Sequence, residues 1–186
     1  MLPNLSLDDI ERLLGEGAHR LVDIGDAGSA QLPHSHLDHA LQTAAVLRDQ
    51  FPEDEALAVA GLVHDIGHLL PGVTDAQHAR AGAAAVRAAL GERVAALVGL
   101  HVAAKRYLVA LDPGYGGVLA ADSVASLVTQ GGPMSPDEQV AFLREPWAAD
   151  ALVLRRADES GKVEGLVVGR LGEWMEVVRR LDAHAA

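Results

Sequence analysis

The chain has 186 residues, a length that suits one domain with a hydrophobic core, and it contains no cysteine. The absence of cysteine excludes disulfides, thiolate nucleophiles, iron–sulfur clusters and cysteine-based zinc sites. Its 26 acidic residues against 15 basic ones, a net charge of −11, argue against a surface for nucleic acid or anionic membranes. Because the first residues carry no basic segment and no stretch approaches ~18 apolar residues, we expect no export signal, no membrane partner and a cytoplasmic location.

Alanine, leucine and valine dominate the composition while aromatic residues make up 3%, which favours helices over sheets. Apolar residues at helical spacing, interrupted by Gly, Pro and Asp, predict helices over residues 7–21, 37–47, 53–69, 74–90, 92–108, 118–130, a short one from 135, 146–159 and 170–184. Loops are expected over 23–36 and 112–117. Only residues 163–168 could form a strand, and one strand makes no sheet. The sequence therefore predicts a single all-α domain over residues 1–186.

The third predicted helix carries His64, Asp65 and His68 directly after an otherwise apolar run over 56–63. At 100° per residue these three side chains fall within a wedge about 100° wide. A carboxylate beside two imidazoles on a buried face costs free energy unless something pairs with it. A metal ion is the simplest partner, and a hydrogen-bonded Asp–His pair without metal is the alternative.

Further potential ligands lie on other predicted helices. His39 is on the buried side of the second helix, 25 residues before His64, which is enough for one helix hairpin. His78 lies in the first turn of the fourth helix, His101 on the fifth, and Asp158 closes the eighth. Any one of them alone is more often an ordinary core or surface residue. Together they indicate a metal centre.

These residues resemble a known pattern. His39, the His64-Asp65 doublet and Asp158 match, in order and spacing, the H…HD…D pattern of the HD-domain superfamily of helical metalloproteins. His78 and His101 are similar to the further histidines of its two-metal branch. Four local strings resemble the phosphonate-degrading HD-domain oxygenases: LDHALQTA (37–44), HDIGHLL (64–70), HVAAKRY (101–107) and QGGPMS (130–135). The resemblance covers about residues 37–163.

The resemblance implies an HD-domain helical bundle that holds two iron ions in a mixed Fe(II)/Fe(III) state and uses O2 as co-substrate. It implies that the first iron is held by His39, His64, Asp65 and Asp158. Asp65 would bridge to the second iron, which His78 and His101 complete. Independently of the resemblance, four imidazoles and two carboxylates suit iron or manganese better than zinc or magnesium.

On the substrate side, the resemblance assigns phosphonate binding to six positions: His68, Lys105, Ser123, Ser126, Gln130 and Arg155. Lys105 stands one helical turn after His101 and is one of only two lysines in the chain. The implied reaction is oxidative cleavage of the carbon–phosphorus bond of a 1-hydroxyphosphonate, which releases phosphate and a carboxylic acid. For Lys105 a solvated helix end, and for the serines ordinary helix-start positions, are the alternatives.

Two departures and two rival functions remain. Family members acting on 2-amino-1-hydroxyethylphosphonate carry a Tyr and a Glu where this chain has Ser29 and Leu32, so we expect little preference for that amine. One rival is an HD-type metal-dependent phosphohydrolase acting on a small phosphoester or nucleotide. The other is a metal-bound binding or sensor module without turnover. Metal analysis separates them, because iron near two per chain favours the oxygenase and a single Mn, Ni or Co favours the hydrolase.

Overall fold

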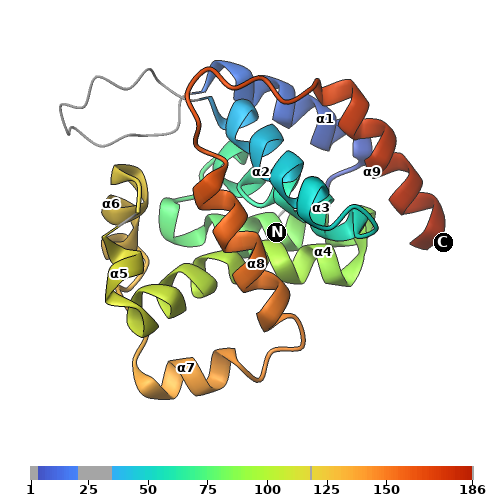
Figure 1. The fold of residues 1–186 in the computed structure, drawn as a ribbon. Coiled ribbons are helices and arrows are strands. Elements are labelled where there is room, and N and C mark those ends of the chain that lie inside the picture. The colour runs from blue at the N-terminus through green and yellow to red at the C-terminus, as the bar shows by residue number, and fades with distance from the viewer. Residues whose placement is uncertain (1–3, 21–34, 118, 186) are drawn as a thin grey trace.

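The computed structural model describes residues 4–20, 35–117 and 119–185, and it is built from helices (Figure 1). The helices are α1 (Leu7–Glu16), α2 (His36–Gln50), α3 (Glu55–Val63), α4 (His78–Leu111), α5 (Pro113–Gly116), α6 (Ala121–Thr129), α7 (Pro136–Phe142), α8 (Ala148–Ser160) and α9 (Leu171–Ala185). Short 3₁₀ turns cover Gly17–His19, Ile66–Leu69 and Asp75–Gln77. The described residues contain no β-strand element, and residues 163–168 form turns and irregular backbone. The all-α prediction is confirmed.

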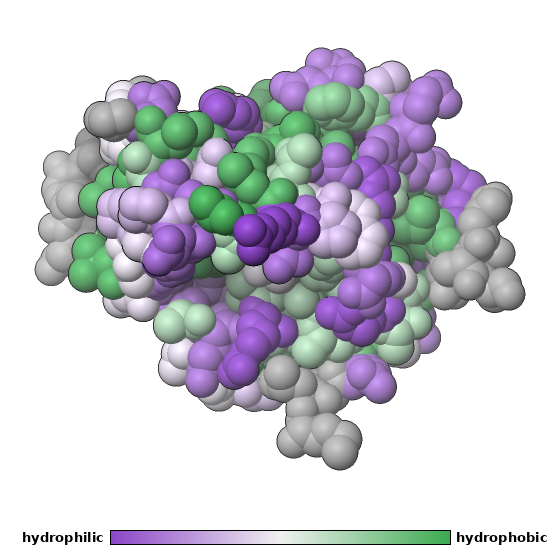
Figure 2. Space-filling view, turned by 90° about the horizontal axis from the view of Figure 1, so that it is seen from below, coloured by the Kyte–Doolittle hydropathy of each residue, from purple (hydrophilic) through white to green (hydrophobic). Residues whose placement is uncertain are grey.

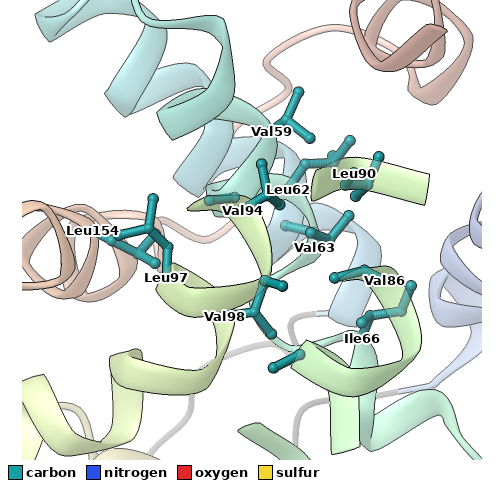
Figure 3. Packing of buried hydrophobic residues seen from close by; sticks show 14 of the residues in the cluster. Val59, Leu62, Val63, Ile66, Val86, Leu90, Val94, Leu97, Val98 and Leu154 are labelled. Atoms are coloured by element: carbon teal, nitrogen blue, oxygen red, sulfur yellow. The ribbon is translucent and has the colours of Figure 1, made fainter. Parts of the chain in front are cut away.

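The core forms around α3, which is apolar all round and buried from Leu57 to Val63. Figure 3 shows its side chains packed against those of α4, with Leu154 of α8 beside Leu97 of α4. α2 lies along α3, and α1 and α9 cover the neighbouring side (Figure 1). A helix buried on every face needs neighbours all round, and α2, α4, α8 and α9 supply them. The ends of α2, α3 and α8 thereby meet beside α4.

The third predicted helix is shorter than expected. α3 ends at Val63, Asp65 leaves the helical region (φ −99°, ψ 8°), and Ile66–Leu69 continues as a 3₁₀ turn. A Cβ on Gly67 would lie 2.0 Å from the carbonyl oxygen of His78, so the turn packs against the start of α4 at a distance only glycine allows. The expectation of one continuous helix over 53–69 is therefore wrong, and Asp65 is placed by a break in the helix.

The fourth and fifth predicted helices form one helical run with a bend. Gly91 has φ 79° and ψ 176°, which breaks α4 between the two predicted segments. By length and composition alone, Asp75–Leu111 could cross a membrane, but half of its most apolar window is buried inside the protein. Figure 2 shows one face of the molecule, where apolar side chains lie in small groups among hydrophilic ones. The apolar composition of α4 is therefore explained by its role as a bent helix of the core.

Three short helices, α5, α6 and α7, lie to one side of the core (Figure 1). The predicted loop over 112–117 contains the single turn of α5, capped by the side chain of Asp112. The short helix expected from residue 135 is present as α7, and a capping box begins it, with Ser135 and Glu138 bonded to each other's backbone N–H groups. No described side chain of α6 belongs to the buried apolar cluster. Polar contacts described below therefore carry most of its attachment.

Candidate metal centre

The six predicted metal ligands converge from three helices and from the break after α3. His39 comes from α2, His64 and Asp65 follow the end of α3, His78 and His101 come from α4, and Asp158 comes from α8. All are buried except Asp65, whose side chain is 22% exposed. Potential ligand atoms form two groups, and within each group all of them lie within 4.8 Å of one another. The groups are His39, His64 and Asp158, and Asp65, His68 and His78.

The Asp65 carboxylate lies between two pairs of imidazoles. Its Oδ2 is 3.8 Å from Nε2 of His39 and 3.5 Å from Nε2 of His64. Its Oδ1 is 3.5 Å from Nε2 of His78 and 3.4 Å from Nε2 of His101. One oxygen therefore faces each pair, the arrangement that a carboxylate shared by two cations would need.

The backbone fixes the orientation of all four imidazoles. The Nδ1 atoms of His39, His64 and His101 lie 2.9, 2.8 and 2.7 Å from the carbonyl oxygens of Gly161, Gly61 and Val98, and Nδ1 of His78 faces the carbonyl of Asp75 in the same way. A carbonyl only accepts, so in each neutral ring Nδ1 carries the proton and Nε2 presents its lone pair. Metal-ligating histidines are commonly held in this way.

These Nε2 atoms face one another at hydrogen-bond distance. The two atoms are 3.2 Å apart in the His39–His64 pair and 3.0 Å apart in the His78–His101 pair. With both rings of a pair in the tautomer that the backbone selects, two lone pairs point at each other and need a cation between them. A proton between the two nitrogens of a pair can supply this positive charge, and a metal ion bound by both nitrogens supplies it better. The donor set therefore fits two metal ions.

The electrostatics of the first pair favour an ionised Asp158 carboxylate and a neutral His64 ring, whereas they favour a proton on His39. Burial alone would raise the pKa of Asp158, but the charges of Arg155 and Lys162 outweigh it and hold that pKa well below its usual range. Burial lowers the pKa of His64 to about 4. Burial alone would lower the pKa of His39, but the neighbouring Asp158 carboxylate outweighs burial and raises it. A metal ion bound here would displace that proton from His39.

Gly161 lets the end of α8 approach α2 closely enough to support His39. A Cβ at this position would lie 2.6 Å from Oγ1 and 2.8 Å from the backbone nitrogen of Thr43. Gly161 is also the residue whose carbonyl oxygen accepts from His39, and it follows Asp158 by three positions. The same close contact thus positions two of the candidate ligands.

A cavity of about 120 Å³ opens beside the two imidazole pairs. All six residues predicted to bind phosphonate line it: His68, Lys105, Ser123, Ser126, Gln130 and Arg155. Lys105 Nζ donates to Ser126 Oγ at 2.7 Å, and Arg155 Nη2 donates to Ser123 Oγ at 3.1 Å. Burial and the neighbouring Arg155 lower the pKa of Lys105 to about 8. The cavity thus combines cations and hydroxyls suited to a small tetrahedral anion.

His68 lies close to the second imidazole pair. Its ring stacks on that of His78 with centroids 3.8 Å apart, and its Nε2 is 4.0 Å from Asp65 Oδ1. Nε2 of His101 is nearer to that oxygen, at 3.4 Å. Burial also lowers the pKa of His68 to about 4, which keeps its ring neutral. The geometry favours His101 over His68 as the ligand that accompanies His78.

Sequence reasoning missed several residues around the cavity. Lys162 and Asp75 line it, Tyr115 OH accepts from Arg155 Nε at 3.1 Å, and Glu159 contacts Arg155 from behind the cavity wall. Lys162 stands one helical turn after Asp158 and is the second of the two lysines, a signal that could have identified it. Asp75 and Tyr115 lie in segments whose spacing carries no such signal. Ser29 and Leu32 lie outside the described residues.

Comparison with known proteins places the chain among oxygenases. Residues 8–93 match the family model described as myo-inositol oxygenase. A [1-hydroxy-2-(trimethylamino)ethyl]phosphonate dioxygenase (glycine-betaine-forming) from Leisingera caerulea is 32% identical over 86% of this chain and 86% of its own length. A hydroxymethylphosphonate dioxygenase from Gimesia maris is 34% identical over 81% of this chain and 79% of its own length. A probable inositol oxygenase from Oryza sativa subsp. japonica is 33% identical over 34% of this chain and 21% of its own length.

The likeness to the two phosphonate dioxygenases extends over most of both partners, and the family-model match contains His39, the His64-Asp65 doublet and His78. These relatives are oxygenases, as the resemblance in the sequence predicted, and their names favour neither the hydrolase nor the sensor alternative. The chain therefore belongs to the family of metal-dependent oxygenases that includes these phosphonate dioxygenases and is related to myo-inositol oxygenase.

Proposed function

We propose that this protein is a non-haem di-iron dioxygenase that uses O2 to cleave the carbon–phosphorus bond of a 1-hydroxyphosphonate. The products would be phosphate and a carboxylic acid. The observation that carries the proposal is the pairing of imidazole Nε2 atoms around the two oxygens of Asp65, beside a cavity that holds Lys105 and Arg155. The names of the two relatives with the widest coverage support the same chemistry.

In this proposal the first iron would be held by His39, His64 and Asp158, and the second by His78 and His101. Asp65 would serve both ions. When bound, the pair in its Fe(II)/Fe(III) state supplies the activation of O2 and the electron transfer that this chain's side chains cannot perform. The role of the protein is to fix ligand number and orientation, which the Nδ1–carbonyl bonds do for every imidazole.

The chain's own contribution to the substrate is charge neutralisation and placement. Lys105 and Arg155 provide two cations, and Ser123 and Ser126 provide hydroxyl donors, on the cavity wall contributed by α4, α6 and α8. We propose that they bind the phosphonate oxygens together with Gln130 and His68. Binding the phosphonate on this wall would direct the carbon that bears the hydroxyl toward the imidazole pairs. Orientation of this kind is the main way in which a rigid site accelerates a reaction.

The decisive experiment measures phosphate release and O2 consumption together. The protein is loaded with iron under anaerobic conditions and supplied with hydroxymethylphosphonate, 1-hydroxyethylphosphonate or the trimethylamino compound. We expect phosphate only when O2 is admitted, in equal molar amounts. Methylphosphonate, which lacks the hydroxyl group, is the matched negative control.

Two results would contradict the proposal. Phosphate released from a phosphoester without O2 would assign the site to hydrolysis. Oxidation of myo-inositol without activity on any hydroxyphosphonate would assign it to a neutral polyol. The second result is not expected, because a polyol offers no anion to Lys105 and Arg155 in the buried cavity.

A further inference from the structure

α6 carries much of the proposed phosphonate site but is weakly anchored by apolar packing. Ser123 and Ser126 lie on it and Gln130 directly follows it. Its Val124 and Val128 are 47% and 78% exposed, and no described α6 side chain belongs to the buried apolar cluster. Polar contacts must therefore determine where this helix sits relative to the cavity.

Glu159 of α8 holds the first end of α6. Its Oε1 accepts from the backbone nitrogen of Ala120 at 2.6 Å, and its Oε2 accepts from Ser123 Oγ at 3.2 Å. The third residue of α6 is Ser123, so Glu159 of another helix accepts from the N–H of the cap residue Ala120 in the way that a glutamate at the third helical position does in a capping box. Glu159 also accepts from Arg155 and lies 3.6 Å from Lys162 Nζ. It does not line the cavity, and its side chain is 14% exposed.

Asp75 holds the other end. Its carboxylate accepts from Gln130 Nε2 at 3.1 and 3.3 Å and from the Thr129 hydroxyl. Asp75 begins the 3₁₀ turn that leads into α4, and its own carbonyl oxygen accepts from Nδ1 of His78. The far end of α6 is thereby tied to the segment that positions one of the candidate metal ligands.

We propose that Glu159 and Asp75 are positioning residues that hold α6 across the cavity, so that its serines and Gln130 face a bound phosphonate together with Arg155. Glu159 acts from behind the wall, where it restrains Ser123 and Arg155 without facing the substrate itself. The ligand rests on the proposed function, whereas the attachment of α6 stands on its own contacts. Loss of either carboxylate frees one end of the helix and weakens anion binding.

The test uses the iron-loaded protein under anaerobic conditions, with methylphosphonate as a probe that cannot turn over. Calorimetry measures its binding, hydrogen exchange measures the opening of the α6 amides, and metal analysis measures iron. Glu159→Ala is expected to weaken binding about ten- to a hundredfold, the usual effect of losing bonds to a charged group, and to speed exchange in α6. Glu159→Gln should restore part of the affinity, because its amide oxygen can still accept from the Ala120 N–H while its amide nitrogen can no longer accept from Ser123 or Arg155.

Thr129→Val tests the Asp75 end without touching any proposed ligand, and it should speed exchange at the end of α6 and weaken binding by a smaller factor. Asp137→Asn, which removes an exposed carboxylate from α7, is the matched control and should change neither. Iron content should stay at the wild-type value in Thr129→Val. If Glu159→Ala loses iron, its weaker binding could come from the metal centre, and Thr129→Val then decides whether the attachment of α6 controls anion binding.

The proposal is overturned if Glu159→Ala and Thr129→Val bind methylphosphonate as wild type does, or if α6 exchange is unchanged in both. It is also overturned if the wild-type protein does not bind methylphosphonate at all. Failure of the proposed function looks different. In that case no hydroxyphosphonate releases phosphate, while binding of methylphosphonate still depends on Glu159.

Discussion

Substituting Gly161 by alanine should damage the metal centre through a single methyl group. The added Cβ would lie 2.6 Å from Thr43 Oγ1 and 2.8 Å from the Thr43 nitrogen, whereas ordinary contacts begin near 3.4 Å. The Thr43 hydroxyl can rotate, so the contact with the backbone nitrogen decides the displacement, and the ends of α8 and α2 must separate by about 0.6 Å. A shift of this size stretches the 2.9 Å bond from His39 Nδ1 to the Gly161 carbonyl oxygen to the limit of a hydrogen bond, and it also displaces Asp158.

Two magnitudes follow from this displacement. Overpacking of this kind costs about 1–3 kcal/mol of folding free energy. Loss of the partner that orients a ligating imidazole lowers metal affinity about ten- to a hundredfold. We expect Gly161→Ala to lose iron from the first site while the second site is less affected. The assay is iron content after dialysis against a graded series of chelator concentrations, with thermal unfolding of the apo and loaded forms in parallel.

The control for Gly161→Ala is Gly172→Ala in α9, where a Cβ would meet nothing within 4 Å. This variant should retain iron and fold at least as stably as wild type, because alanine favours helix over glycine. If Gly161→Ala retained iron like the wild type and unfolded at the same temperature, the contact with Thr43 would not position His39, and our account of the first site would be wrong.

Three further predictions concern metals, pH and substrate. Asp65→Ala should lose both irons and the paramagnetic signal of a mixed-valent pair, while His101→Ala should spare the first iron more than the second; unimpaired iron binding in Asp65→Ala would refute the shared carboxylate. Because the pKa of Lys105 is lowered to about 8 by burial, kcat/KM for a hydroxyphosphonate should fall as pH rises through that value and the cation is lost, and Lys105→Arg should move the fall to higher pH; an unchanged profile in that variant would contradict the assignment. Because Leu32 offers no partner to an ammonium group, the preference for 2-amino-1-hydroxyethylphosphonate over hydroxymethylphosphonate should stay below about a hundredfold in kcat/KM, and a larger preference would show that another acid binds the amine.

The periodicity of apolar residues was sufficient to predict an all-α fold and most helix positions. The prediction failed at Asp65, because the apolar pattern there indicates a continuing helix whereas the backbone of Asp65 leaves the helical region. The break depends on the close approach of Gly67 to the His78 carbonyl, a contact between segments that are packed only in the folded state. His64 and Asp65 still meet because both adjoin the break. The helical wheel therefore placed the His64 and Asp65 side chains together, although the continuous helix that it assumed ends before Asp65.

The candidate ligands could be predicted because their order and spacing form a recognisable pattern, whereas the groups that support them could not. Glu159 lies one turn after Arg155, and nothing in its spacing reveals that it also reaches Ala120 on a helix 39 residues earlier. Asp75 likewise meets Gln130, 55 residues away. Such contacts depend on how α6 is placed, which local sequence does not determine. Assignment of the ligands themselves stays a prediction until metal is measured.

The Nδ1–H groups of the four imidazoles all donate to main-chain carbonyl oxygens, and this has a consequence for how related proteins can diverge. A main-chain carbonyl survives almost any substitution of the residue that supplies it, so the four imidazoles keep their tautomer while the surrounding side chains drift. Two of the four carbonyls belong to glycines. At Gly161 an added Cβ meets the backbone of Thr43 and displaces the carbonyl itself, and at Gly61 it would lie 2.6 Å from a methyl group of buried Leu47. Substitution of exposed α6 residues such as Val124 and Val128 therefore leaves these carbonyl contacts unchanged. Two relatives at 32% and 34% identity carry names that specify a trimethylamino and a hydroxymethyl phosphonate, so the substrate differs among proteins similar to this chain.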